Sequence, residues 1–185
     1  MKNNLTTELI QEIKKNRKVR NKVDLFYQEF KEKDFQILGK NKSAAIVLSE
    51  IIVDYYTCIE TLFVKISQFF ENNLQKDRWH TDLLYKMTLE VPDIRSQVIS
   101  DKTHAVLLEL LRFRHFRRYY FEFDYDWDKL EFLEKKYNQV KEMFENDILV
   151  FENFLEKLNG DDKIVQTTGI DSERVKQIIH EFSSS

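Results

Sequence analysis

The sequence is poor in residues that interrupt or cross-link a chain. It contains three glycines, one proline and one cysteine among 185 residues. So few breakers exclude a turn-rich fold and allow long helices. The single cysteine, Cys58, excludes an internal disulfide, and its apolar neighbourhood VDYYTCIETLF favours a buried, inert thiol over a nucleophile. We therefore expect an all-α protein in a reducing compartment, the cytoplasm.

Long hydrophobic runs and a strong charge of one sign are also missing. No segment approaches about 18 uncharged apolar residues, and the N-terminal segment has no continuous apolar core, so neither a membrane span nor a signal peptide is predicted. The net charge of −3 excludes a protein that is basic all over, but it permits a local basic site. We expect a soluble protein that has no membrane partner.

The positions of apolar residues at helical spacing predict a bundle of helices. We expect an antiparallel, four-helix bundle of the up-down type with an extra N-terminal helix region, occupying residues 1–160 as one domain. A tail over residues 161–185 carries one short amphipathic helix, from Val175 to Phe182. The predicted helices cover residues 5–33 (one helix, or two joined near Asn16), 43–74, 77–91, 101–122 and about 126–160.

Polar residues predict where these helices begin and end. Ser43, Asp77, Ser100 or Asp101, and Asp126 or Asp128 are expected N-caps, because their side chains can accept a hydrogen bond from the first helical turn. Asn159 and Gly160 are expected to end the last long helix.

The segment LLRFRHFRRYYFEFDYDW, residues 110–127, holds four arginines and a histidine. At about 100° per residue, Arg114, His115, Arg118 and Tyr119 fall within an arc of roughly 140°. One interpretation is structural: the arginines complement the helix dipole and pair with acids at positions 122, 124, 126 and 128. The other is a phosphate-binding site for RNA, because guanidinium groups match phosphate oxygens and tyrosines stack on bases. Its phosphate ligands would be Arg112, Arg114, Arg117 and Arg118.

Other potential catalytic or metal-binding residues are sparse. His80 is interpreted as a capping or packing residue, and His104 and His180 as isolated, exposed side chains. No set of residues has the spacing of a metal site, and neither a glycine-rich phosphate loop nor a serine nucleophile motif is present. We expect no metal and no cofactor.

From about residue 44 to 158, the sequence resembles the HepT-like branch of the HEPN superfamily of helical bundles. The resemblance lies in the segments VDYYTCIETLFVKIS, WHTDLLYKMTLEVPDIRSQVIS, LLRFRHFRRYYFEF and YDWDKLEFL. It implies the toxin half of a bacterial toxin–antitoxin pair, a metal-independent ribonuclease that acts as a homodimer. It also implies a partner, a minimal nucleotidyltransferase that serves as the antitoxin.

The signature of that superfamily is an arginine, four to six residues, a histidine, one residue and a tyrosine. Laid on RHFRRYYF, the arginine matches Arg114, whereas Tyr119 and Phe121 stand at the histidine and tyrosine positions. Tyrosine is a poor base at neutral pH, so His115 is the candidate for proton transfer, with Tyr119 assisting; a packed or helix-terminal histidine is the alternative. Arg114 and Arg118 would hold the scissile phosphate.

The same departure bears on regulation and on activity. The resemblance implies adenylylation of the motif tyrosine by the nucleotidyltransferase, but Phe121 has no hydroxyl group to modify. Tyr119 and Tyr120 are the neighbouring acceptors. A second hypothesis is therefore a helical dimer without ribonuclease activity that binds the nucleotidyltransferase and RNA, and a third is a purely structural dimer.

Overall fold

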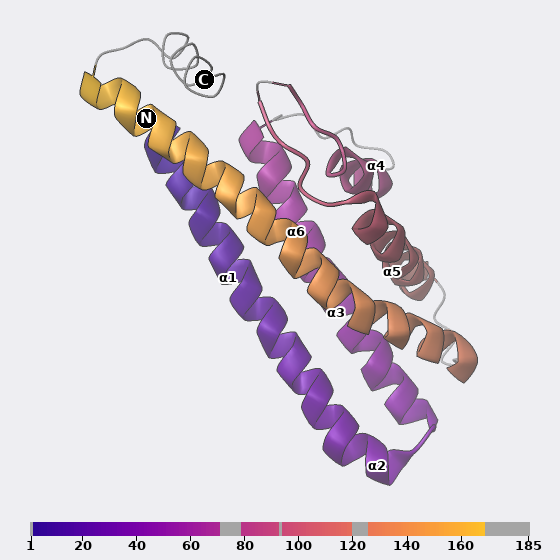
Figure 1. Cartoon of the computed structure of the whole chain (residues 1–185). Coiled ribbons are helices and arrows are strands. Elements are labelled where there is room, and N and C mark those ends of the chain that lie inside the picture. The colour runs from indigo at the N-terminus through magenta and orange to yellow at the C-terminus, as the bar shows by residue number, and fades with distance from the viewer. Residues whose placement is uncertain (1, 71–78, 93, 120–125, 169–185) are drawn as a thin grey trace, which may run out of the picture.

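The computed structural model describes residues 2–70, 79–92, 94–119 and 126–168, which are almost entirely helical (Figure 1). Within these ranges no strand forms, and the only β-type pairing is an isolated bridge between Val91 and Arg95. The all-α prediction is confirmed. The helices are α1 (Lys2–Glu29), α2 (Phe35–Leu38), α3 (Lys42–Phe70), α4 (Trp79–Lys86), α5 (Asp101–Tyr119) and α6 (Trp127–Thr168).

Side-chain contacts give the direction of each long helix. Asn16 and Glu12 of α1 contact Cys58 and Lys65 of α3, so these two helices are antiparallel. On α6, residues that bond to α1 run in the reverse order: Thr7 meets Asn159 and Tyr27 meets Glu134.

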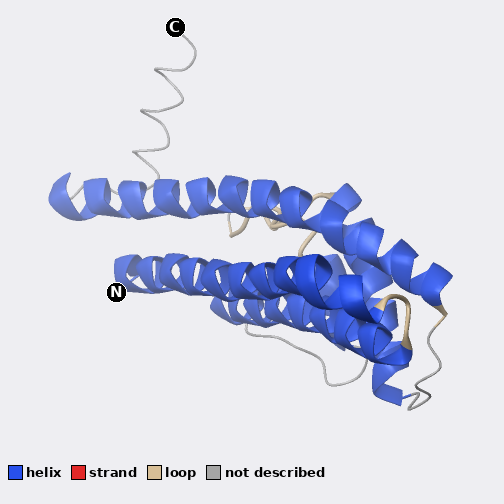
Figure 2. Ribbon diagram, turned by 90° about the horizontal axis from the view of Figure 1, so that it is seen from below, coloured by secondary structure: helices blue, strands red, loops and turns tan. Residues whose placement is uncertain are grey.

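Helices α3 and α6, in contrast, are parallel, because the ring pairs Tyr55–Tyr137 and Phe63–Phe144 advance together along both helices. Helix α5 is antiparallel to α3, since Arg114 meets Glu60 and Arg117 meets Glu50. Figure 2, turned by 90° from Figure 1, shows the described helices running lengthwise beside one another.

Helix α3 is the centre of the bundle, as its nearly all-round apolar pattern predicts. It packs against α1, α4, α5 and α6, and α5 also packs along α6, as expected for the helix that contains Arg114. The largest fully buried apolar residues of α3 are Leu48, Ile52, Tyr56, Ile59, Leu62 and Phe63. None of the described helices is long and apolar enough to span a membrane.

The N-terminal helix passes Asn16 without a break and then widens into a π-helical turn, Phe30–Asp34. In this turn the Phe35 N–H donates to the carbonyl of Phe30, five residues earlier. Phe30 is buried, and the Phe35 ring lies 5.9 Å from its ring and 5.7 Å from that of Trp127. The wide turn therefore keeps both phenylalanines in contact with the bundle. The helical segment ends at Gly39, whose φ of 61° suits a residue without a side chain.

Two of the predicted helix starts are confirmed and one is wrong. Ser100 Oγ accepts from the Thr103 N–H at 3.3 Å, and Asp126 Oδ1 accepts from the Asp128 N–H at 2.9 Å. The cap of α3 is Asn41 rather than Ser43, because Asn41 Oδ1 accepts from the Ala44 N–H at 2.8 Å. Asp77 lies outside the described residues.

The predicted end of the last helix is wrong. Helix α6 continues through Gly160 to Thr168. A glycine inside a helix costs only about 1 kcal/mol relative to alanine, and Gly160 does not adopt the positive φ of a helix-terminating glycine. The short helix expected from Val175 to Phe182 lies outside the described residues, and the division of the chain near residue 160 stays a prediction.

Candidate functional site

The basic segment of α5 divides into residues that the structure describes and residues that it does not. The side chains of Arg112, Arg114, His115 and Arg117 are described, whereas those of Arg118 and Tyr119 are not, although both belong to α5. Tyr120 and Phe121 lie outside the described residues. The predicted grouping of Arg114 and His115 with Arg118 and Tyr119 therefore stays a prediction.

The three described arginines point to different surroundings. Arg112 is 65% exposed and pairs with Glu109 of its own helix at 2.7 Å. Arg117 pairs with Glu50 of α3. Arg114 points inward, is 17% exposed, and pairs with Glu60 of α3 at 3.0 Å. The described partners are therefore not the acids that follow α5 in sequence, which the structural interpretation named.

Around Glu60, the residues Tyr56, His80, Arg114 and His115 form a half-buried group from three helices, which we call the Glu60 cluster. The Glu60 side chain is only 6% exposed. His80 Nδ1 donates to Glu60 Oε1 at 2.5 Å, and Arg114 Nη1 donates to the same carboxylate. Because the Nδ1 proton is directed to Glu60, the 3.4 Å approach of Arg114 Nη1 to His80 Nδ1 reflects two donors sharing one acceptor.

Two aromatic contacts complete the cluster. The His80 and His115 rings meet edge to face with centroids 5.2 Å apart, and the Arg114 guanidinium lies 5.8 Å from the centre of the Tyr56 ring. Burial raises the pKa of Tyr56, and the charge of Glu60 raises it further, so the phenol stays protonated. The other ring side chains of the cluster are imidazoles.

The cluster combines three chemical capacities. Glu60 can fix the orientation and tautomer of His80, as a carboxylate does for a histidine in many catalytic sites. His80 and His115 supply two imidazoles, which are the most frequent groups in acid–base catalysis. Arg114 supplies a permanent positive charge that can stabilise an anion.

Sequence analysis missed Glu60 and the hydrogen bond that His80 donates to it. His80 does pack, with its ring edge to face on His115 of α5, and it also bonds to Glu60 of α3. One sequence signal was present: Glu60 is a carboxylate on the apolar side of α3, next to the buried Ile59 and Phe63. His104, which was predicted to be isolated and exposed, is half-buried. Its ring lies edge to face with that of Tyr85, with the ring centroids 6.3 Å apart. His180 lies outside the described residues.

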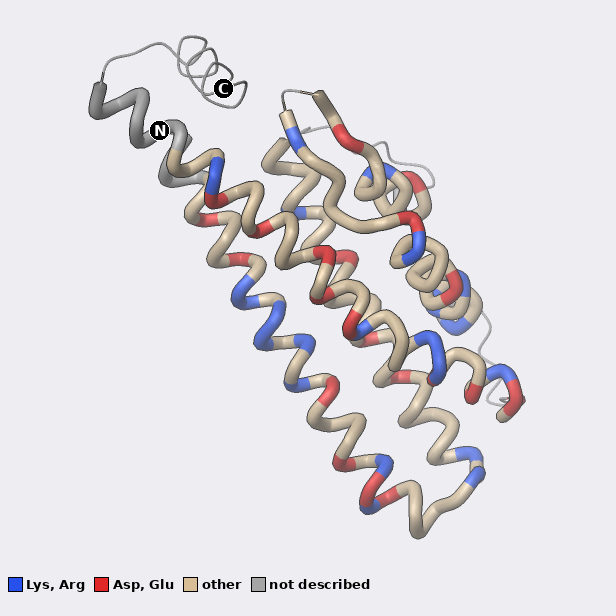
Figure 3. Tube along the Cα trace, viewed as in Figure 1, with Lys and Arg blue, Asp and Glu red and all other residues tan. Residues whose placement is uncertain are grey.

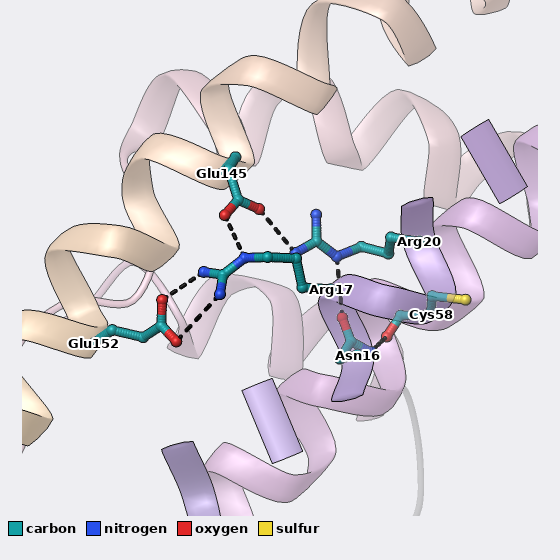
Figure 4. A network of polar contacts seen from close by, with 6 residues as sticks. All are labelled: Asn16, Arg17, Arg20, Cys58, Glu145 and Glu152. Carbon is teal, nitrogen blue, oxygen red and sulfur yellow. Dashed lines mark hydrogen bonds and ion pairs between the residues drawn. The ribbon is translucent and has the colours of Figure 1, made fainter. Parts of the chain in front are cut away.

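A second polar group lies between α1 and α6, and we call it the Arg17 network (Figure 4). Arg17 pairs with Glu145 at 2.5 Å and also with Glu152. Arg20 donates to Glu145 at 3.1 Å and to Asn16 Oδ1 at 3.1 Å. The hydrogen bond to Glu152 raises the pKa of Arg17, so this guanidinium stays charged. The network holds the two helices together.

Neither region offers a metal site. Among the described residues, no group of three or more histidine, cysteine, aspartate or glutamate side chains is arranged to hold a metal ion.

The fold and the cluster together define a class: a helical bundle, in which α1, α3, α5 and α6 alternate in direction along the chain, with a histidine and arginine cluster where α3, α4 and α5 meet. A family model described as HepT-like protein matches residues 47–155. This is more than half of the chain, which belongs to the HepT-like family. Searches of curated proteins and of solved structures give no significant match. The matched segment contains every residue of the Glu60 cluster, whereas α1 precedes it.

Proposed function

We propose that the protein is the toxin component of a bacterial toxin–antitoxin pair and cleaves RNA without a metal ion. The observation that carries this proposal is the juxtaposition of two imidazoles, His80 and His115, with the Arg114 guanidinium in one half-buried cluster. Membership in the HepT-like family supports the same choice. Arg114 is the arginine of the sequence motif, His115 is the candidate that replaces the motif histidine, and Glu60 and His80 complete the proposed site.

The proposed reaction uses the 2′-hydroxyl of the RNA as its nucleophile. One neutral imidazole accepts the proton of this hydroxyl while the 2′-oxygen bonds to phosphorus. The bond from phosphorus to the 5′-oxygen breaks, and the second imidazole, which is protonated, donates a proton to that leaving oxygen. The products are a 2′,3′-cyclic phosphate and a 5′-hydroxyl end, so no co-reactant is consumed. Arg114 stabilises the charge that develops on the phosphorane.

The remaining predicted residues have secondary roles in this proposal. Tyr119 assists proton transfer, and Arg112, Arg117 and Arg118 bind neighbouring phosphates. The protein forms a two-fold homodimer that brings two copies of residues 112–121 near a shared cleft. An apolar depression of about 350 Å³ beside Arg112, lined by Phe113, Phe116 and Phe132, supports an interface there.

The proposed antitoxin is a minimal nucleotidyltransferase. It neutralises the protein either by direct binding or by transferring an adenylyl group to Tyr119 or Tyr120. Mass spectrometry after incubation with the cognate enzyme and ATP distinguishes the two routes, since only the second adds mass to a tyrosine.

The test of cleavage uses purified protein and a long RNA in the presence of EDTA. Wild type should produce fragments with cyclic phosphate ends, and His115→Ala should reduce the rate by about 10²–10⁴-fold, the usual contribution of a general acid or base. His104→Ala is the matched control, because it removes an imidazole of the same helix that lies outside the cluster. Absence of cleavage by the wild type, or equal rates for His115→Ala and His104→Ala, would overturn the assignment.

A second candidate function is favoured by the engagement of Arg114. Its guanidinium is already paired with Glu60, and Tyr119 occupies the histidine position of the motif. Both observations suit a dimer that binds the nucleotidyltransferase and RNA without cleaving either. This function predicts RNA binding that weakens on Arg114→Ala and no cyclic phosphate ends under any condition of the cleavage test.

A further inference from the structure

The N-terminal helix carries a concentration of positive charge that the Glu60 cluster does not use. Residues 13–23 contain six lysines and arginines and no acid, in a chain whose net charge is −3. Figure 3 shows this blue stretch along α1. Arg17 and Arg20 point to α6 and are neutralised by Glu145 and Glu152, and Lys15 pairs with Glu12 at 2.8 Å. Three lysines remain.

These three, Lys14, Lys18 and Lys22, are exposed and form what we call the lysine row. They follow one another at intervals of four residues, so they lie on one face of α1 at steps of about 6 Å along its axis. Within the described part of the chain, no carboxylate lies at ion-pair distance from any of them. The result is a straight line of three uncompensated positive charges.

Such a row differs from three exposed lysines elsewhere in the molecule that have acidic partners. Lys33 pairs with Glu29 at 2.9 Å, Lys40 with Glu131 at 2.6 Å, and Lys129 with Asp126 at 3.7 Å. Like charges four residues apart on a helix repel each other, whereas alternating charges attract. Repulsion within the lysine row therefore destabilises α1 in the isolated chain, and an anionic partner would remove this repulsion.

The row is presented on a rigid support. The opposite side of α1 carries Ile13 and Arg20, both buried, and the Arg17 network fixes the helix to α6 on the same stretch of residues. The lysine side chains consequently share one surface whose direction is set by the bundle. A fixed line of positive charge fits a linear polyanion better than a compact anion, because each lysine can meet a successive charged group.

We propose that the lysine row binds the phosphate backbone of RNA. The choice of RNA among polyanions rests on the proposed function. Lysine ammonium groups act as point charges toward phosphates and need no fixed fork geometry, which suits a backbone contact that is independent of sequence. An anionic membrane fits less well, since the same face ends in Glu29. Helix α1 lies outside the segment that the family model matches.

The row contacts RNA away from the bond that is cleaved. Helix α1 packs on α3 and α6, whereas the Glu60 cluster lies where α3 meets α4 and α5. Loss of the row should therefore weaken the affinity for long RNA and leave the bond-breaking step unchanged. In a cleavage assay KM should rise while kcat stays the same, which a general disturbance of the fold would not produce.

The experiment compares two triple variants that remove the same charge. In the first, Lys14, Lys18 and Lys22 are each changed to Gln; in the second, Lys33, Lys40 and Lys129 are changed to Gln. Binding of a fluorescent single-stranded RNA about 30 nucleotides long, with 2′-O-methyl groups that prevent cleavage, is measured by anisotropy over a range of KCl concentrations. Circular dichroism and thermal melting check that both variants are folded.

The first variant should lower the slope of log K against log salt by about 2, because each lost contact to a single strand contributes about 0.7. Its affinity at low salt should fall by about tenfold or more, while the second variant keeps the slope of wild type. Equal slopes for all three proteins would overturn the proposal, as would an equal loss in both variants.

Two further arms separate this proposal from its neighbours. Binding of phosphatidylserine vesicles and of an aspartate-rich peptide is measured with the same three proteins. If the Lys14, Lys18 and Lys22 variant lost binding to vesicles or to the peptide but kept wild-type RNA binding, the proposal would be overturned in favour of a membrane or an acidic protein. Because the RNA cannot be cleaved, the binding result does not depend on catalysis. A protein that shows the predicted slopes but cleaves no RNA contradicts the proposed function alone.

Discussion

The Arg17 network and the Glu60 cluster are both groups of charged side chains enclosed by helices, yet they differ in the kind of charge that they hold. In each, a buried glutamate is the anion: Glu152 in the first and Glu60 in the second. The cations of the Arg17 network are guanidinium groups, which keep their charge at every physiological pH. Those of the Glu60 cluster include imidazoles, whose charge changes near neutral pH.

This difference teaches that a buried ion pair alone does not mark a reaction site. The Arg17 network joins α1 to α6, and Arg20 also lies over the ring of Phe144, with 4.7 Å between the guanidinium carbon and the ring centre. Its two arginines are paired with glutamates of α6, so the network stabilises the contact between the two helices. The Glu60 cluster joins its ion pair to two imidazoles at the junction of three helices. The predictions below separate the two regions by activity first and by stability second.

The largest expected effect is on RNA cleavage, and it should appear only in the Glu60 cluster. His80→Asn keeps a donor to Glu60 at the position of Nδ1 but cannot titrate, so cleavage should fall by about 10²–10⁴-fold with little change in stability. Arg17→Gln should leave the rate per folded molecule unchanged. Rates are compared in EDTA, and a His80→Asn rate equal to wild type would remove His80 from the reaction.

Removal of the buried anion should have the next largest effect. Glu60→Ala leaves Arg114 half-buried without its carboxylate, and breaking a buried pair in this way costs about 3–5 kcal/mol. Urea unfolding followed by circular dichroism measures the change. Glu60→Gln is the milder companion, because the amide oxygen still accepts a hydrogen bond from Arg114. If Glu60→Ala were as stable as the wild type, the cluster would not be a buried ion pair.

The corresponding change in the Arg17 network should have a smaller effect. Arg17→Met leaves Glu152, which is buried, without its strongest partner, and a lost hydrogen bond to a charged group is worth about 1.5–3 kcal/mol. Water can reach the other acid, Glu145, which limits the loss. The same urea experiment gives the number. A loss larger than that of Glu60→Ala would reverse the ranking of the two regions.

The smallest expected effect is an alkaline loss of stability that originates beside the Arg17 network. Burial raises the pKa of Tyr27 to about 12, above the ordinary value of 10.0. A group whose pKa is raised by folding stabilises the protein below its unfolded pKa, and this contribution is lost as the pH rises through the folded value. Unfolding free energy should therefore decline between pH 10 and 12, and Tyr27→Phe should flatten that decline. A decline of equal steepness in Tyr27→Phe would assign it to other tyrosines.

Local signals allowed much of the fold to be predicted from the sequence. The caps Ser100 and Asp126 lie next to the helices they begin, so their effect depends on neighbours in the chain. Gly160 was misread because a glycine ends a helix only when the chain leaves the helical conformation there, and tertiary packing of α6 overrides that tendency. The observed cap of α3, Asn41, lies two residues before the predicted cap, Ser43. Both residue types can cap a helix, so the sequence alone did not decide between them.

The candidate site was only half predictable. Arg114 stands at the arginine position of a recognisable motif and His115 follows it in the sequence, whereas Glu60 and His80 are brought to them by the packing of α3, α4 and α5. No local pattern encodes that Glu60 on one helix and His80 on another share a hydrogen bond. The carboxylate within an apolar helix was the one available sign that something polar would have to meet it.

The wide turn at Phe30–Asp34 has a consequence for the history of the chain. A residue inserted into an α-helix rotates everything beyond it by about 100°, which would carry Phe35 away from Trp127. A π-helical turn accommodates the extra residue within a few positions and leaves the side chains on both sides in place. A homologous helix that is one residue shorter between Tyr27 and Phe35 should therefore be an unbroken α-helix. It should still place the equivalents of Phe30 and Phe35 against the core. The length of this short interval would then distinguish lineages within the family, independently of the residues that carry the chemistry.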